Sequence, residues 1–169
     1  MKYFSYCFAF VLFLLLTSFA PEKKFPVVDL KDLNGKIVST SDFMTKHKIT
    51  VVSFWATWCI PCQRELDIYG ELYDEWKQKY DIEIVGVTID NVRQLSKVKP
   101  LIAQKQWKFT ILSDVNEDLK KTLNFEYVPQ TYILDSKGNI RFDHSGFKPG
   151  DEVEMEKIFD ELQNNKSEK

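Results

Sequence analysis

The feature that most constrains this chain is a strand-like run that leads straight into a pair of cysteines. Residues 49–56 read ITVVSFWA, a β-branched and aromatic run without alternation. Such a run is typical of a strand buried on both faces of a sheet. The letters CIPC follow at residues 59–62, and from Pro61 to about Tyr80 apolar side chains recur at steps of three and four. The sequence therefore predicts a buried strand, a short turn that carries two thiols, and a helix.

The predicted turn places Cys59 at the N-terminus of the helix. Backbone N–H groups without partners and the helix dipole favour an anion there, so a thiolate of Cys59 would be stabilised. Pro61 suits the first helical turn, where its missing N–H leaves nothing unpaired. Cys62 lies one turn further in, close enough to form a small disulfide and less exposed than Cys59. These residues alone leave three interpretations open: a redox dithiol, half of a metal site, or a structural clip.

The rest of the pattern alternates strands with helices. Residues 25–40, FPVVDLKDLNGKIVST, alternate around an Asn-Gly pair and predict a β-hairpin. Further along we expect a buried strand over 82–89, a helix over about 92–106 with a kink or break near Pro100, a short strand at 109–114, a short helix at 116–123, a strand, turn and strand over 131–147, and a last helix over about 151–162. This order predicts an α/β fold with a mixed sheet covered on both faces.

Residues 1–20 differ in kind from the rest of the chain. An unbroken apolar stretch over 7–16 follows a single lysine, and Ser-Phe-Ala at 18–20 stands before a proline. Small residues at these positions fit a signal peptide that is cleaved after residue 20, and the alternative is an uncleaved membrane anchor. Either interpretation predicts that residues 21–169 are transported to the far side of a membrane. Cys7 would be lost with a cleaved signal, which leaves two cysteines in an exported domain where disulfides persist.

The remaining chain reads as one domain with a balanced charge. The full sequence has 23 basic and 25 acidic residues, a net charge of −2. This charge gives no indication of binding to nucleic acid or to an anionic membrane. No internal repeat or Gly/Ser-rich linker divides the chain. We therefore expect a single domain over residues 21–163, followed by a polar tail over 164–169.

These motifs resemble the thioredoxin superfamily, and more closely its exported TlpA/ResA-like branch. FWATWCIPC at 54–62 is similar to the W-C-x-P-C active site of that branch. YVPQTYILD at 127–135 resembles its loop with a cis-proline before a strand, and KGNIRFDHSG at 137–146 its following hairpin. Residues 25–43 are similar to the extra N-terminal hairpin of the branch. The resemblance covers roughly residues 25–162 and implies a thioredoxin-like fold: a central mixed β-sheet flanked by helices, with an added N-terminal β-hairpin.

The resemblance also implies roles for individual residues. Cys59 would be the nucleophile and Cys62 the resolving thiol, so that thiolate attack forms a mixed disulfide that the second thiol cleaves. Pro129 would be the cis-proline that faces the dithiol, and Val128 would offer backbone hydrogen bonds to a bound peptide. The substrate-binding surface would comprise Trp58, Ile60, Pro61, Val128 and Pro129.

Two positions depart from the pattern that the resemblance sets. Minimal thioredoxins carry a buried Asp where this chain has Ser53, whose hydroxyl cannot serve as a base near neutral pH. Glu65 lies three residues after Cys62, on the same face of the helix, and matches an acid that this branch uses near its active site. We therefore expect Glu65 to be partly buried, to have a raised pKa and to handle the proton of Cys62; the alternative is a solvated glutamate. Asp67 replaces a frequent proline, and we expect this change to be mild.

Other kinds of site fit the sequence less well. A zinc site usually needs four ligands, and His47 and His144 lie too far apart to complete one with the CxxC pair, so no metal is expected. We interpret both histidines as ordinary surface or loop residues, with His144 half-buried. A peroxiredoxin-type peroxidase would carry P-x-x-x-T-x-x-C, but Thr57 stands two residues before Cys59 rather than three. A redox-inert binding module with a structural disulfide is a further alternative, although so short a loop constrains the unfolded chain only weakly.

The sequence therefore predicts an exported thiol-disulfide oxidoreductase that exchanges disulfides with protein substrates and needs no cofactor. The resemblance implies that it acts more often as a reductant, kept reduced by a membrane electron donor, as in cytochrome c maturation. We expect it in the periplasm or elsewhere outside the cytoplasmic membrane. Residues 3–20 would tether it there if the signal is not cleaved.

Overall fold

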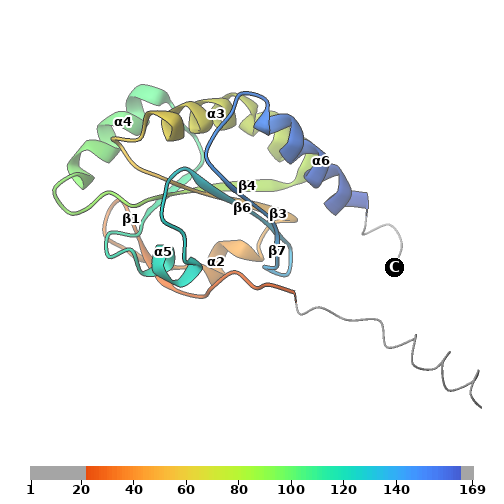
Figure 1. Cartoon of the computed structure of the whole chain (residues 1–169), viewed down its shortest axis with the longest axis horizontal. Coiled ribbons are helices and arrows are strands. Elements are labelled where there is room, and N and C mark those ends of the chain that lie inside the picture. Colours follow the sequence, from red (N-terminus) through yellow and green to blue (C-terminus); the bar gives the residue numbers. More distant parts are fainter. Residues whose placement is uncertain (1–21, 165–169) are drawn as a thin grey trace, which may run out of the picture.

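The sheet of this protein has seven strands and is covered by helices on both faces (Figure 1). The computed structural model describes residues 22–164, so the predicted signal or anchor over residues 1–20 lies outside the described residues. The strands are β1 (Asp29–Asp32), β2 (Ile37–Ser39), β3 (Ile49–Trp55), β4 (Ile82–Thr88), β5 (Thr110–Ser113), β6 (Gln130–Asp135) and β7 (Ile140–Ser145), and they lie in the order β2-β1-β5-β4-β3-β6-β7.

The pairing of the strands makes the sheet mixed, as predicted. β3, β4 and β5 run parallel to one another, whereas β1, β2, β6 and β7 pair antiparallel with their neighbours. The β1–β2 hairpin turns at Asn34-Gly35, where Gly35 has a φ of +86° that suits glycine. The predicted N-terminal hairpin is therefore confirmed, and it pairs with the edge of the sheet through β5.

The helices divide between the two faces of the sheet. They are α2 (Ser41–Met44), α3 (Ile60–Tyr80), the 3₁₀ turn η1 (Leu95–Lys97), α4 (Val98–Lys105), α5 (Asp118–Leu123) and α6 (Asp151–Asn164). α3, α4 and α6 lie over one face, and α2 and α5 lie over the other (Figure 1). Among residues 22–164, none of these helices has both the length and the apolar composition needed to cross a membrane.

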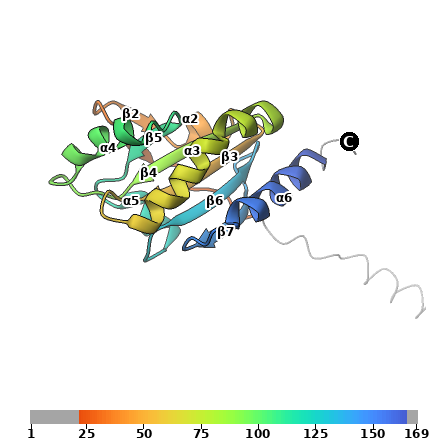
Figure 2. The ribbon, with the colours of Figure 1, turned by 90° about the horizontal axis from the view of Figure 1, so that it is seen from above.

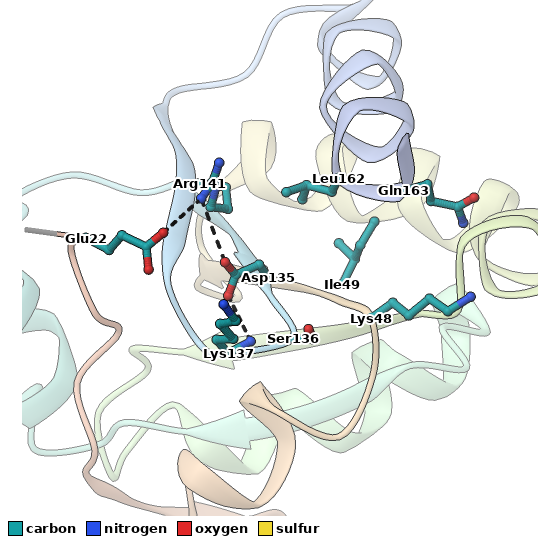
Figure 3. Close-up of a pocket in the computed structure, with 9 residues that line it drawn as sticks. All are labelled: Glu22, Lys48, Ile49, Asp135, Ser136, Lys137, Arg141, Leu162 and Gln163. Carbon is teal, nitrogen blue, oxygen red and sulfur yellow. Dashed lines mark hydrogen bonds and ion pairs between the residues drawn. The ribbon is translucent and has the colours of Figure 1, made fainter. Parts of the chain in front are cut away.

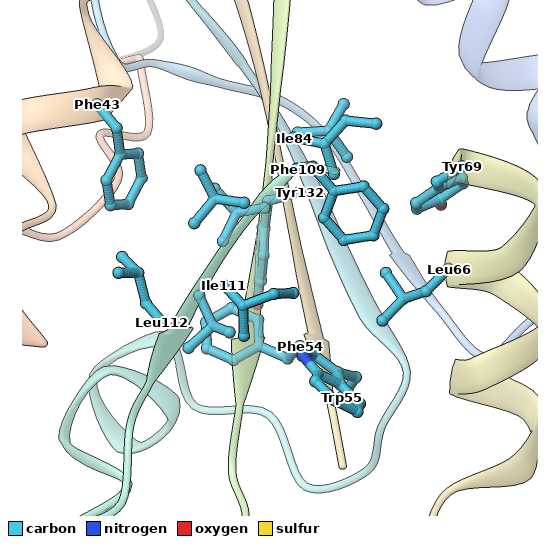
Figure 4. Close-up of a cluster of buried hydrophobic side chains, with 14 of the residues drawn as sticks. Phe43, Phe54, Trp55, Leu66, Tyr69, Ile84, Phe109, Ile111, Leu112 and Tyr132 are labelled. Atoms are coloured by element: carbon cyan, nitrogen blue, oxygen red, sulfur yellow. The ribbon is translucent and has the colours of Figure 1, made fainter. Parts of the chain in front are cut away.

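The core forms where α3 packs on the central strands. Every residue of β3 is buried, as the apolar run predicts. The predicted apolar face of α3 is also confirmed, since Leu66, Tyr69, Tyr73, Trp76 and Tyr80 are all buried. Figure 4 shows Leu66 and Tyr69 directed from α3 towards Trp55 and its neighbours on the sheet. This packing fixes α3, and with it the turn that carries the two cysteines, against the end of β3.

Two helix boundaries differ from the predictions. The expected helix over about 92–106 consists of the 3₁₀ turn η1 and the shorter helix α4, which begins at Val98. Pro100 lies inside the first turn of α4, where its missing N–H costs no hydrogen bond, so the break comes just before the proline. At the other end of the chain α6 continues to Asn164, the residue predicted to begin the polar tail.

Asp67 has a larger structural role than expected. Its carboxylate accepts a hydrogen bond from Nζ of Lys105 at 2.6 Å and from Nε1 of Trp107 at 3.0 Å. Trp107 in turn packs edge-on against Trp55, with ring centroids 5.2 Å apart. Asp67 therefore ties α3 to the segment after α4, which a proline at this position could not do.

Candidate active site

The two cysteines lie where β3 ends and α3 begins. β3 ends at Trp55, and a short turn leads to Cys59, which is the N-cap residue of α3. The N–H of Cys59 donates to the carbonyl oxygen of Ala56 at 3.0 Å, which closes the turn. The N–H of Cys62 points back at the Sγ of Cys59 at 3.3 Å. The first turn of α3 therefore directs an N–H at the Cys59 sulfur, where the helix N-terminus favours an anion.

The dithiol is present as a disulfide between Cys59 and Cys62, whose Cα atoms are 5.3 Å apart. Cys59 is 6% exposed and Cys62 is fully buried, so the predicted order of exposure is confirmed. The side chains next to them are open to solvent: Trp58 is 57% exposed and Ile60 is 55% exposed. The Cys59 sulfur thus lies in a shallow recess, which is its small exposed area between the exposed apolar side chains of Trp58 and Ile60.

The loop before β6 faces this recess. The Val128–Pro129 peptide bond is cis, as the motif predicts. The carbonyl oxygen of Val128 lies 3.7 Å from the Sγ of Cys59. Tyr127, which precedes Val128, is 78% exposed and extends the apolar rim of the recess. Segments about 70 residues apart in the sequence therefore meet at one sulfur atom.

A buried carboxylate that sequence reasoning missed holds the turn before Cys59. Asp90 is fully buried just after β4 and accepts hydrogen bonds from the N–H and the Oγ1 of Thr57, each at 2.8 Å. It also accepts from Oγ1 of Thr88 at 2.7 Å. The side chain of Gln63 donates to the carbonyl oxygen of Thr57 from the other side. β3 and β4 are parallel neighbours, so their carboxyl ends meet here, and this placement was the available signal.

We expect Asp90→Asn to destabilise the fold and to loosen this turn. An amide at residue 90 presents one oxygen where two are used, so a partly buried donor of Thr57 loses its partner. Such a loss costs about 1–3 kcal/mol. Urea denaturation of the oxidised protein measures it, with Asp143→Asn, an exposed carboxylate on β7, as the control that should change the free energy of unfolding by less than about 0.5 kcal/mol. Equal destabilisation by the two variants would contradict the role given to Asp90.

Glu65 is buried beneath the dithiol, more completely than expected. It is 2% exposed, and its carboxylate accepts a hydrogen bond from Oγ of Ser53 at 2.7 Å and from Oγ1 of Thr131 at 3.2 Å. Burial raises the pKa of Glu65 to about 7, although both hydrogen bonds act to lower it. The predicted burial and raised pKa of Glu65 are confirmed. Ser53, where minimal thioredoxins carry the acid, instead donates a hydrogen bond to an acid that comes from the helix.

The two histidines do not lie at the dithiol. His47 pairs with Asp81 at 3.3 Å, and His144 pairs with Asp151 at 3.1 Å. The side chain of His144 is 30% exposed, so the expected half-burial is confirmed. Within residues 22–164, no group of three or more His, Cys, Asp or Glu side chains is arranged to hold a metal ion.

A separate pocket lies at the other end of β3 (Figure 3). It borders Ile49, the first residue of β3, whereas the dithiol follows the last. Three of its charged groups pair: Nη1 of Arg141 lies 3.5 Å from Glu22 and 3.9 Å from Asp135. This pocket is therefore not part of the dithiol site.

Comparisons with known proteins agree with this geometry. The model of the AhpC/TSA family matches residues 21–143. The chain is 30% identical over 132 residues to the thiol-disulfide oxidoreductase ResA of Bacillus thuringiensis subsp. konkukian, covering 78% of this chain and 73% of that protein. It is 34% identical over 135 residues to the thioredoxin-like protein YneN of Bacillus subtilis, covering 77% and 74%.

A solved structure of a thioredoxin-like protein from Porphyromonas gingivalis superposes with a TM-score of 0.72 at 35% identity. The superposition covers 85% of this chain and 94% of that one. The family match, the relatives and the fold indicate the same family. The chain belongs to the AhpC/TSA family, and within it to the thioredoxin-like thiol-disulfide oxidoreductases of the ResA kind.

Proposed function

We propose that this protein is an exported reductant of protein disulfides, with Cys59 as the nucleophile and Cys62 as the resolving thiol. The position of the Cys59 sulfur carries the proposal, because it lies at the N-terminus of α3 with the N–H of Cys62 directed at it. Once the disulfide is reduced, the same N–H groups and helix dipole stabilise a thiolate at Cys59. Cys62 is fully buried, so a partner disulfide reaches Cys59 first.

The proposed substrate surface surrounds Cys59. Trp58 and Ile60 supply exposed apolar area on the helix side, with Pro61 behind them in the first turn. On the other side, the backbone of Val128, just before the cis bond to Pro129, would bind an extended peptide next to the sulfur that the peptide must reach. A polypeptide with an accessible disulfide fits this surface, since apolar contact and backbone hydrogen bonds require no particular side chain.

Glu65 is the proposed base for Cys62. Its position on the same helical face, one turn beyond Cys62, places its carboxyl beneath the dithiol. A carboxyl with a pKa of about 7 accepts and returns a proton readily near neutral pH. Cys62 must lose its proton to attack the mixed disulfide, and Glu65 would take it.

The proposed direction and location follow from the relatives and from the N-terminal sequence. Relatives named thiol-disulfide oxidoreductase ResA support disulfide exchange as the reaction. The reductant role of the cytochrome c maturation type, with electrons from a membrane donor, is what the resemblance to the exported TlpA/ResA-like branch implies. The apolar stretch within residues 1–20 supports export across the cytoplasmic membrane, with residues 3–20 as a tether if it is retained. By contrast, the hydroxyl of Thr57 donates to Asp90 and not to the dithiol, which gives a peroxidase no support.

The reduction potential of the Cys59–Cys62 couple tests this proposal. Equilibrating the full chain with glutathione buffers of graded ratio and quantifying free thiols should give a value near or below the about −270 mV of thioredoxin. A value near about −120 mV, typical of a strong dithiol oxidant, would reverse the proposed direction. A couple that fails to equilibrate would be an inert clip. A Cys59→Ser variant is the control, because it cannot form the disulfide.

A further inference from the structure

A row of polar side chains crosses the sheet beneath Glu65. Ser53 on β3 is the cross-strand neighbour of Thr131 on β6, and Thr131 is the neighbour of His144 on β7. Directly paired residues point to the same face of a sheet. This face is the one that α3 and α6 cover (Figure 2). Since β7 is the edge strand, the row runs from the buried middle of the sheet to its rim.

The row connects the buried carboxyl to a half-exposed ion pair. Oγ1 of Thr131 donates to Glu65 at 3.2 Å, and Nε2 of His144 lies 3.1 Å from Oδ2 of Asp151 at the start of α6. A small pocket of about 10 Å³ lies between them, bordered by Thr131, His144, Asp151 and Tyr69. This is about the smallest volume that admits one water. Its walls offer the hydroxyl, imidazole and carboxylate groups that such a water needs.

Glu65 accepts hydrogen bonds from Ser53 of β3 and Thr131 of β6, and Tyr69 follows it one turn later on α3. The pocket beside Thr131 adds the polar groups of the neighbouring elements: His144 from β7, and Asp151 with Glu154 from α6. The negative charge of Asp151 adds slightly to the burial that raises the pKa of Glu65. The hydroxyl of Tyr69 donates to Sδ of Met155 at 3.1 Å, so it closes the inner wall of the pocket.

The dithiol side is a poor exit for a proton during the reaction. Cys62 is fully buried, and Cys59 reaches solvent only through the recess between Trp58 and Val128. In the mixed disulfide a partner protein is bound over that recess, and stable protein interfaces bury about 800 Å² on each partner. Yet this is the stage at which Glu65 holds the proton of Cys62. A second exit is needed that the partner does not cover.

We propose that Glu65 exchanges its proton with solvent through Thr131 and the His144–Asp151 pair at the rim of the sheet, while the partner protein covers the dithiol. The inference rests on the proposed role of Glu65 as the base. As Cys62 attacks Cys59, its thiol proton passes to Glu65, the Cys59–Cys62 disulfide forms, and the partner cysteine leaves as a thiolate. Glu65 must have lost its own proton before it can take this one, and both protons leave it by the same route, along the Thr131 hydroxyl to the pocket and to His144. Thr131 and His144 are positioning residues that act through Glu65.

Rapid acid quenching of single turnovers tests the route. The full chain is reduced, mixed with a disulfide-bonded protein substrate in weak buffer, and quenched at intervals, so that the decay of the mixed disulfide measures the Cys62 step. We expect His144→Ala and Thr131→Val each to slow this decay by about tenfold, less than the roughly 10²-fold of Glu65→Gln. Added imidazole should restore His144→Ala, and Thr131→Ser should retain the wild-type rate. Thr131→Ser keeps the hydroxyl in either case, whereas a purely structural role of His144 does not predict recovery with imidazole.

His47→Ala is the matched control, because His47 is also partly buried and paired with a carboxylate, Asp81. It should leave the decay unchanged. If His144→Ala and Thr131→Val decay at the wild-type rate while Glu65→Gln is slow, the route is wrong and Glu65 keeps its role. If Glu65→Gln is also as fast as wild type, the assignment of the base fails and the route fails with it. A slow His144→Ala that imidazole does not restore also overturns the route.

Discussion

Replacing Cys62 with serine is expected to stop turnover and to leave the substrate joined to Cys59 through a disulfide. Cys59 keeps its place at the N-terminus of α3, so its attack on a partner disulfide continues. A serine hydroxyl cannot cleave the resulting mixed disulfide, so the reaction ends there. Steady-state reduction of disulfides should fall by a factor on the order of 10³ or more, as in other covalent catalysts that lose an essential member.

The trapped complex also identifies the partner. Cys62→Ser incubated with extracellular or periplasmic extract should give heavier species on a non-reducing gel that dithiothreitol releases, and mass spectrometry names them. Cytochrome precursors, diverse secreted proteins or a membrane donor alone would each indicate a different role. Cys59→Ser is the matched control and should trap nothing, because Cys62 is fully buried. If Cys59→Ser traps substrate as well as Cys62→Ser does, either thiol can attack a partner, and the assignment of Cys59 as the nucleophile is wrong.

The dithiol and its facing loop were predictable because each is encoded within a short stretch of sequence. The apolar run that ends at Trp55 fixes β3, and the CIPC letters fix the turn and the start of α3. The cis bond before Pro129 was expected from the motif around it and is present. The residues that define each of these two features lie within a few positions of one another in the sequence. A short sequence pattern is therefore enough to predict each feature.

The supports of the site were not predictable, because they join segments far apart in the chain. Asp90 holds Thr57 across 33 residues, and Thr131 reaches Glu65 across 66. Neither contact leaves a local pattern, since both depend on the register of neighbouring strands. Asp67 illustrates the same limit, because its bonds to Lys105 and Trp107 appear only once α3 and the segment after α4 are packed together.

The inference from Ser53 was correct but did not identify which residue supplies the acid. The hydroxyl of Ser53 cannot replace the buried acid of a minimal thioredoxin, and this remains true. The structure adds that Ser53 donates to Glu65 at 2.7 Å, so the acid reaches the same region from the helix instead of the strand. The position of a carboxyl relative to the dithiol is therefore kept while the element that supplies it changes.

Glu65→Gln is expected to make the protein more stable at neutral and alkaline pH. The pKa of Glu65 is about 7 in the fold, against 4.5 for an unperturbed glutamate, chiefly because burial disfavours the charge. The folded state therefore binds the proton more tightly than the unfolded state, and the associated stability is complete below pH 4.5 and lost as the pH rises through 7. A shift of this size corresponds to about 3 kcal/mol. Glutamine carries no charge at any of these pH values, so no such stability is lost as the pH rises. Its amide N–H can donate to the hydroxyl of Ser53 or Thr131, which then accepts instead.

Urea denaturation of the oxidised chain between pH 4 and 8 measures this difference. The free energy of unfolding of the wild type should fall with pH by about 3 kcal/mol more than that of Glu65→Gln, mostly between pH 4.5 and 7. Glu71→Gln, an exposed glutamate on the same helix, is the matched control and should follow the wild-type curve. Parallel curves for Glu65→Gln and wild type would mean that Glu65 titrates as an ordinary surface acid. If the expected difference is found, the charged carboxylate of Glu65 lowers the stability of the fold at neutral pH. A glutamine would fill the same space without that cost, so the glutamate is explained by its ability to exchange a proton.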